Sequence, residues 1–225
     1  MVRSYHHGNW SSVTPWGRLE GTGSVSPKRV DHEQRRRHIT DALARLTIKG
    51  GLERVSFREV AEEAGVSVRL VQYYFGSKDE LLLAAWQHLG ARVTRRIFSA
   101  IAAAGEKASP RAVIQIVLNE FLPVDTERSD ASLLFIAFHT ASLTDPSLAR
   151  AEAREMPRQL ASFIATKLEE AREAGDLADN IDPVHESVAF VTEIIGLGHM
   201  ILSDTYSVET AIRIADYTVD RLFRR

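Results

Sequence analysis

The sequence has 225 residues, enough for one mid-sized domain or for a small module fused to a larger one. Its 44% hydrophobic and 26% charged residues are ordinary for a globular protein, which excludes a fibre or a chain that is disordered throughout. Cysteine is absent, so disulfides, thiolate metal sites and cysteine nucleophiles are excluded. No apolar run is long enough to span a bilayer and no targeting segment is recognisable, so we expect a cytoplasmic protein with no membrane partner.

Charge is unevenly distributed along the chain. The first 80 residues carry 13 Lys and Arg against 10 Asp and Glu, whereas the remainder carries 15 against 20. A basic N-terminal part favours contact with a polyanion at that end. A chance fluctuation would give the same difference, so the charge alone does not decide the partner.

Residues 1–27 differ from everything that follows them. They are rich in Gly, Ser and Pro and show neither a helical nor a strand period, which predicts a flexible N-terminal arm. A second interpretation is that Val25 is the true start of the protein, because a valine codon can initiate bacterial translation. Residues 1–24 would then not belong to the native chain.

From Asp31 onward, apolar residues recur at three- and four-residue spacing, and no segment alternates with the period of a strand. The sequence therefore predicts an all-α fold. Serines stand before several of the expected helices as N-caps, and Pro157 is expected to kink or break the helix that contains it. The expected helices cover residues 31–49, 57–64, 68–75, 78–101, 110–122, 130–143, 146–174, 183–203 and 208–223.

Two short predicted helices are separated only by Gly65-Val66, which is the form of a helix-turn-helix. A glycine permits the sharp turn, and the second helix is short enough to enter a DNA major groove. We expect Leu70 and Phe75 to anchor this second helix, with Val68, Arg69, Gln72 and Tyr73 facing outward. A helical hairpin of any α-protein would share the spacing, but the surrounding basic residues favour DNA. These are Lys28, Arg29, Arg35, Arg36, Arg37 and, at the start of the next helix, Lys78.

Residues 35–89 resemble the DNA-binding domain of the tetracycline-repressor (TetR) family of bacterial transcription regulators. The family signature is G-V-S, a variable helix ending in an aromatic-Phe pair, then Lys and an acidic-Leu step. Gly65-Val66-Ser67, Tyr74-Phe75, Lys78 and Glu80-Leu81 match it. The C-terminal run 193–222 more loosely resembles the choline-responsive, BetI-like subgroup.

The resemblance implies an all-α homodimer of two-domain subunits, and together with the arm this divides the chain into three segments. These are the arm (1–27), a helix-turn-helix DNA-binding domain (28–76) and a larger ligand-binding and dimerisation domain (77–225).

The resemblance also implies phosphate contacts by Ser56, Arg58, Tyr73 and Lys78. The family usually has Tyr at the position of Gln72 and commonly Thr at that of Leu70, so the usual tyrosine contact does not transfer. Gln72 would instead pair with adenine and Arg69 with guanine, unless one or both touch only phosphates. The full set of candidate DNA contacts is Arg35, Arg36, Arg37, Ser56, Arg58, Ser67, Val68, Arg69, Gln72, Tyr73 and Lys78.

The helices between residues 86 and 163 are rich in large apolar groups with a few polar ones interspersed. Such a composition suits a mostly apolar pocket with few hydrogen-bonding groups, although the same aromatics also suit a filled core. The candidate pocket residues are Trp86, Gln115, Asn119, Phe121, Phe135, Phe138, His139, Phe163 and His199, with Glu120 and Met156 as further candidates.

The last two predicted helices have long apolar faces, and Gly196 and Gly198 remove side-chain bulk from the first of them. Close packing against a second subunit would offset the helix-destabilising effect of the glycines, and the resemblance favours this over an intramolecular core helix. The candidate dimer contacts are Val188, Val191, Ile195, Gly198, Leu202 and Ile212.

The expected function is a transcription regulator, a repressor that leaves a palindromic DNA operator when a small-molecule effector binds. The rival hypotheses are an activator or protein-responsive regulator without a small ligand, and a sequence-independent DNA-binding protein. His139 and His199 are isolated, and no metal-binding or hydrolase motif is present. We therefore expect no catalytic residue, no metal site and no cofactor.

Overall fold

The computed structural model describes residues 27–105, 107–144 and 151–224, which are helical with short connections. No strand occurs in these ranges, and an isolated bridge joins Leu177 to Phe223. This arrangement confirms the all-α prediction. The helices are α1 (Pro27–Gly50), a 3₁₀ turn η1 (Leu52–Arg54), α2 (Phe57–Glu63), α3 (Val68–Phe75), α4 (Lys78–Ala103), α5 (Pro110–Phe121), α6 (Thr126–Thr144), α7 (Ala151–Glu173), α8 (Pro183–Leu202) and α9 (Val208–Leu222).

Three helix predictions need correction. Helix α1 begins at Pro27 rather than Asp31, because proline fits the first turn of a helix, where its missing N–H has no partner to lose. The rest of the expected arm lies outside the described residues. Helix α6 begins at Thr126, four residues before the predicted start. Helix α7 continues through Pro157 without the break that was one of the two expected outcomes, and the flanking Met156 and Leu160 are buried.

Serine and aspartate side chains cap the N-termini of both short and long helices. Ser56 Oγ accepts a hydrogen bond from the backbone N–H of Glu59 at 3.3 Å, and Ser67 Oγ accepts one from that of Leu70 at 3.2 Å. Asp182 Oδ1 does the same for the N–H of His185 at 2.8 Å. Each cap satisfies a donor that the helix itself leaves unpaired, so the starts of these helices were predictable from sequence.

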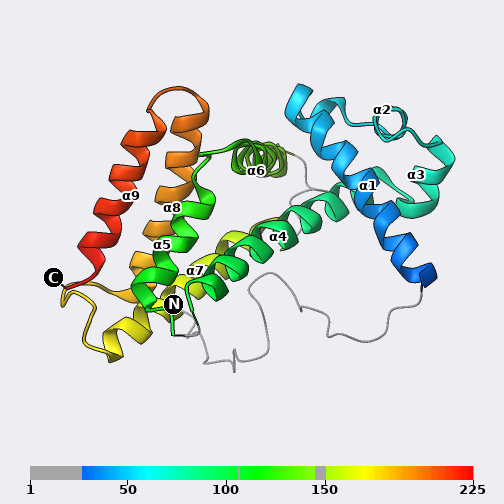
Figure 1. Cartoon of the computed structure of the whole chain (residues 1–225). Helices are drawn as coiled ribbons and strands as arrows, with labels where there is room; N and C mark the ends of the chain where they lie inside the picture. The colour runs from blue at the N-terminus through cyan, green and yellow to red at the C-terminus, as the bar shows by residue number, and fades with distance from the viewer. Residues whose placement is uncertain (1–26, 106, 145–150, 225) are drawn as a thin grey trace, which may run out of the picture.

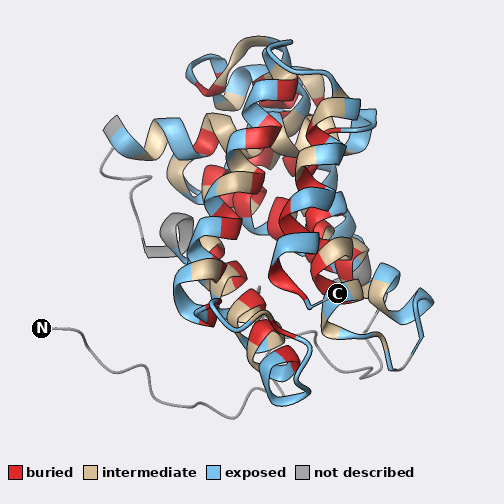
Figure 2. Cartoon of the chain, turned by 90° about the vertical axis from the view of Figure 1, so that its left-hand side faces the viewer, coloured by how far each residue is buried: buried red, intermediate tan, exposed pale blue. Residues whose placement is uncertain are grey.

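Helix α4 connects the two parts of the molecule. Helices α1, α2 and α3 pack together at one end, and α4 runs from them into a bundle formed by α5, α7, α8 and α9, with α6 crossing between (Figure 1). The buried residues lie on the inward faces of the helices (Figure 2) and form one continuous apolar cluster through both parts. The two parts therefore share a core along α4.

The turn between α2 and α3 depends on Gly65. Its φ is +63°, and a Cβ placed on it would meet no other atom within 4 Å. Backbone conformation rather than space therefore requires glycine here, because an L-residue in this region is strained.

Gly65→Ala is expected to lower the free energy of unfolding by about 1 kcal/mol, which is the cost of placing alanine in a left-handed conformation. Gly65→Asn should retain most of the stability, because asparagine tolerates this conformation. Urea unfolding followed by circular dichroism measures both variants. Equal losses for Ala and Asn would show that the strain argument is wrong.

Candidate functional site

The α2–turn–α3 segment has the geometry of a helix-turn-helix. The turn is closed by backbone hydrogen bonds from Gly65 N–H to Glu62 C=O at 3.1 Å and from Val66 N–H to Ala61 C=O at 2.9 Å. Helix α3 is anchored by Val71 and Phe75, which are buried, whereas the predicted anchor Leu70 is only half-buried. Val71 lies three residues after Val68 and four before Phe75, which is the spacing of one helical face, so the helical period could have identified it.

The outer face of α3 presents a row of exposed side chains. Arg69, Gln72 and Tyr73 all point to solvent, and Tyr73 is 76% exposed. Within the described residues the side chains of Arg69 and Gln72 make no hydrogen bond, so both are free to contact a partner. Arg58 on α2 and Lys78 at the start of α4 are also exposed. Ser56 and Ser67 are exposed too, but their hydroxyl groups already serve as N-caps.

Arg36 differs from its neighbours in the basic cluster of α1. Its Nη1 donates a hydrogen bond of 2.6 Å to the backbone carbonyl of Tyr74, and its guanidinium lies 4.5 Å from the centre of the Phe75 ring. Arg36 therefore joins α1 to the C-terminal end of α3, where the helix dipole favours a cation. Arg35 and Arg37 are exposed, so they remain candidates for DNA contact while Arg36 has a structural partner.

Polar contacts hold α1 against the neighbouring helices. Glu63 on α2 accepts hydrogen bonds from Arg45 at 2.7 Å and Lys49 at 3.4 Å. His88 Nε2 on α4 lies 3.1 Å from Asp41 Oδ1 on α1. The hydrogen bond with His88 lowers the pKa of Asp41 in the folded protein. The ionised Asp41 therefore stabilises the fold fully at a pH above its unfolded-state pKa. This stabilisation is lost as the pH falls through the folded-state pKa of Asp41.

A cavity lies in the body of the protein between α4, α5, α6, α7 and α8. It leaves about 670 Å³ unfilled, including the part that opens to solvent. Its polar lining residues are Glu120, Arg128, Ser132 and His199, and the others are apolar. The apolar lining consists of Leu89, Val93, Phe121, Ala131, Phe135, Ile136, Met156, Pro157, Leu160, Val191, Ile194, Ile195 and Gly198.

The cavity includes only some of the residues that the sequence suggested for a pocket. Phe121, Phe135 and His199 line it, as do Glu120 and Met156.

The other candidates lie elsewhere. Trp86 and Phe138 are buried behind the wall, with the Trp86 ring 5.7 Å from Phe135 and 5.4 Å from Phe138. His139 is exposed and stacks on Phe135. Phe163 packs on Phe98, and Gln115 bonds to Asn119 and to Asp216 on α9. The rotation of each helix about its axis, which composition does not reveal, decides these placements.

One end of the cavity is built from charged side chains. Glu120 is 6% exposed, and its two carboxylate oxygens face Arg96 Nε and, at 3.4 Å, Arg128 Nη2. Burial raises the pKa of Glu120 and the two guanidinium groups oppose that rise. Arg128 also pairs with Asp125, yet its buried Nε has no hydrogen-bond partner in the described structure.

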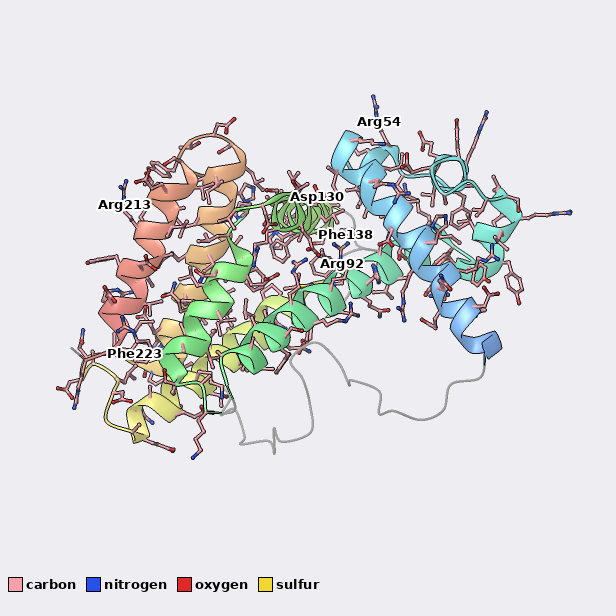
Figure 3. All side chains as sticks on the ribbon, in the orientation of Figure 1. Arg54, Arg92, Asp130, Phe138, Arg213 and Phe223 are labelled. Carbon is pink, nitrogen blue, oxygen red and sulfur yellow. The ribbon has the colours of Figure 1, made fainter. Side chains whose placement is uncertain are left out.

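The ion pairs continue from the cavity toward α1. Arg96 Nη1 lies 2.5 Å from Glu127 Oε1, and Arg92 Nη2 lies 3.1 Å from the same oxygen. Arg92 and Asp130 line a groove between α1, α4 and α6, and Figure 3 shows both on the side of their helices that faces α1. Leu89 and Ala131 line both the groove and the cavity, so these two side chains form the wall between them.

Comparison with known proteins assigns the chain to a family. The profile described as "Bacterial regulatory proteins, tetR family" matches residues 39–85, and that of the "BetI-type transcriptional repressor, C-terminal" matches residues 110–224. The chain belongs to the TetR family. This confirms the resemblance found in sequence and identifies a helix-turn-helix DNA-binding transcriptional regulator.

Individual TetR-family relatives agree with the assignment. A BetI regulator of Paraburkholderia phymatum is 29% identical over 87% of this chain and 96% of its own length. The PksA regulator of Bacillus subtilis is 36% identical, but the match spans 50% of this chain and 53% of PksA.

Solved structures show the same fold. A TetR-family regulator from Rhodococcus sp. has a TM-score of 0.76 at 23% identity and covers 85% of this chain and 100% of its own. A regulator from Saccharomonospora viridis in complex with choline has a TM-score of 0.73 at 22% identity, and the match covers 86% of this chain and 100% of that regulator. FadR from Bacillus subtilis in complex with stearoyl-CoA has a TM-score of 0.65 at 16% identity, and the match covers 83% of this chain and 98% of FadR.

The candidate dimer residues fall into two groups. Val191, Ile195 and Gly198 line the cavity, and a Cβ on Gly198 would lie 3.7 Å from the carbonyl oxygen of Phe121. Val191 and Gly198 are buried within their own chain, whereas Ile195 is half-buried. Val188 and Ile212 are 56% and 39% exposed, and Leu202 is half-buried.

The described residues include neither a membrane-spanning helix nor a cluster of metal ligands. Among them, no helix has the length and hydropathy needed to cross a membrane. No group of three or more His, Cys, Asp or Glu side chains in these ranges is arranged to hold a metal ion.

Arg36→Met is expected to lower the free energy of unfolding by about 1–2 kcal/mol, because it removes a charged hydrogen bond and a cation–π contact while keeping an apolar stem. Arg35→Met, one residue earlier and exposed, should change it by less than about 0.5 kcal/mol. Urea titration of the full chain measures both. Equal effects of the two substitutions would contradict the structural assignment of Arg36.

Proposed function

We propose that this TetR-family protein is a homodimeric repressor that binds a palindromic operator and leaves it when a small molecule occupies the cavity between α4 and α8. The observation that supports this best is that one helix, α4, begins beside the exposed face of α3 and also lines the cavity. We also infer that the protein binds rather than catalyses, needs no cofactor, and acts in the cytoplasm, where its DNA target is.

Sequence discrimination by this protein rests on the exposed face of α3. Arg69 and Gln72 are exposed and have no side-chain hydrogen bond to another described residue, so both can reach base edges, Arg69 at guanine and Gln72 at adenine. Arg35, Arg37, Arg58, Tyr73 and Lys78 surround them and would bind phosphates, which position the protein without selecting a sequence. This division of contacts distinguishes an operator-specific regulator from a sequence-independent DNA-binding protein.

Dimerisation would place two α3 helices on one face of the DNA. The outer side of α8 exposes Val184 and Val188, each 56% exposed, and α9 adds Ile212 and Tyr217. A Cβ on Gly196 would meet nothing of its own chain within 4 Å, so a helix of a second subunit could approach closely there. An isologous contact between two such faces yields a two-fold dimer, which matches a palindromic site.

The effector would act through α4 as a population shift between two placements of the DNA-binding helices. Leu89 on α4 and Ala131 on α6 are the wall between the cavity and the groove beneath α1. A ligand that displaces this wall would also move the groove. Trp86 packs on the cavity-lining Phe135 from the core side and lies on α4 about one turn closer to α3 than Leu89 does. It would transmit the same displacement toward α3. Complexes of fold neighbours with choline and stearoyl-CoA support a ligand-binding body.

Selection from random duplex DNA at physiological salt is expected to enrich an inverted repeat. Arg69→Ala should weaken binding to that repeat by about 1–3 kcal/mol and relax the preference at one base position in each half-site. Lys78→Ala is the matched control. It should weaken binding to all sequences equally and reduce the slope of the logarithm of the binding constant against the logarithm of the salt concentration by about 1. If Arg69→Ala weakened binding to all sequences equally, Arg69 would contact a phosphate rather than a base. The absence of any enriched repeat would contradict the operator hypothesis.

Val188→Asp is expected to weaken the dimer at least about tenfold, because it places an unpaired charge in an apolar contact. Folding of the subunit should be unchanged, since Val188 is exposed within its own chain. Sedimentation equilibrium measures the association, with Leu143→Asp on α6 as the control at a 74% exposed leucine. A dimer that is unaffected by Val188→Asp would exclude this face of α8.

A further inference from the structure

The charged end of the cavity contains a donor without an acceptor. Arg128 pairs through Nη1 with Asp125 and through Nη2 with Glu120, whereas its Nε is buried and makes no hydrogen bond in the described structure. A buried N–H of a charged group that lacks a partner is unfavourable. Arg128 is part of the cavity wall, so a turn of its side chain that brought Nε to the cavity would let a ligand oxygen accept a hydrogen bond from it.

The same end has no free negative charge for a cationic ligand. Both oxygens of Glu120 face guanidinium groups, those of Arg96 and Arg128, and burial further disfavours its ionised form. The aromatic lining consists of the phenyl rings of Phe121 and Phe135 and the imidazole of His199, and no Tyr or Trp of the described residues joins them. A quaternary ammonium group is typically bound by a cage of aromatic faces, of which Trp is the most favourable. The lining therefore favours an oxygen acceptor over a cation.

The remainder of the cavity suits a hydrocarbon. Met156, Pro157 and Leu160 on α7 face Val191 and Ile194 on α8, and none of these five side chains carries a hydrogen-bonding group. Burying an apolar chain here releases water from nonpolar surface and requires no polar partner. Ser132 follows Arg128 by one helical turn on α6, so its hydroxyl is a second donor on the same side of the helix.

We propose that the effector of this regulator is an apolar carboxylic acid, with its carboxylate bound by the guanidinium of Arg128 and the hydroxyl of Ser132 and its hydrocarbon chain against α7 and α8. This proposal rests on the proposed function, in which the cavity is the effector site. It adds the chemical class of the ligand and identifies Arg128 as the residue that selects it.

The first experiment compares three probes with the same ten-carbon chain, each kept below the concentration at which it forms micelles. They are decanoate, decanol and decyltrimethylammonium, and calorimetric titration of the full-length protein measures their binding. Decanoate should bind tightest, decanol more weakly, and the ammonium compound weakest. Tightest binding by the ammonium compound, or no binding of decanoate, would overturn the proposal.

Variants then test the residues. Arg128→Gln should weaken decanoate binding about tenfold or more, equivalent to about 1.4 kcal/mol, and leave decanol nearly unchanged. Arg111→Gln is the matched control, because Arg111 is exposed, pairs with Asp220 and does not line the cavity. Ile136→Trp keeps Arg128 and fills the cavity, so it should reduce binding of decanoate and decanol alike and remains informative if Arg128→Gln fails to fold. Equal loss of both ligands in Arg128→Gln, or unchanged binding in Ile136→Trp, would contradict the assignment.

A DNA-release assay separates this proposal from the proposed function. Fluorescence anisotropy of the selected inverted repeat is measured with each probe. Decanoate that binds through Arg128 but does not release DNA would support the ligand chemistry and contradict ligand-controlled release. Release by the ammonium compound but not by decanoate would support an effector site and overturn the carboxylic acid. If Ile136→Trp still responds to decanoate, the ligand acts outside this cavity and both proposals fail.

Discussion

The structure depends most on the packing of α4 against both parts of the molecule. Its first turns place Leu81, Leu82 and Ala85 in the core beneath α1 and α3, and its later turns place Leu89 and Val93 at the cavity. One helix of 26 residues is nearly rigid along its axis, because each backbone hydrogen bond supports the next. A displacement at the cavity end of α4 is therefore a displacement beside α3, and no flexible linker lies between the two sites.

Electrostatic contacts follow the same route as the apolar core. From Glu120 in the cavity wall, ion pairs lead through Arg96 and Glu127 to Arg92 in the groove under α1. Asp41 on α1 is close enough to Arg92 for that cation to help lower its pKa, together with its hydrogen bond to His88. A buried charged side chain in such a network is destabilising unless it is paired. Because neighbouring ion pairs share side chains, a rearrangement of one pair changes the interaction energy of the next pair.

The helix-turn-helix and the exposed face of α3 were largely predictable from sequence because their signals are local. The caps Ser56, Ser67 and Ser77 and the turn residue Gly65 act within a few residues of themselves, and the exposed positions of α3 follow from the period of a short helix. Arg36 was the exception. Its partner, the carbonyl of Tyr74, is 38 residues away, so nothing near it in sequence separates it from Arg35 and Arg37.

The cavity was predictable only as a region. Its walls come from α4, α5, α6, α7 and α8. If any of these helices were rotated about its axis by one residue, about 100°, residues that line the cavity would move into the core and core residues would line the cavity. That rotation placed Trp86 and Phe138 behind the wall and brought Arg128 and Ser132 into it. By itself, the sequence determined the helical fold, the family and the exposed face of α3, because caps, glycines and helical periods act locally. Only the tertiary structure decided which side chains meet in the cavity and that Arg128 has an unpaired donor there, because these depend on contacts between helices distant in the chain.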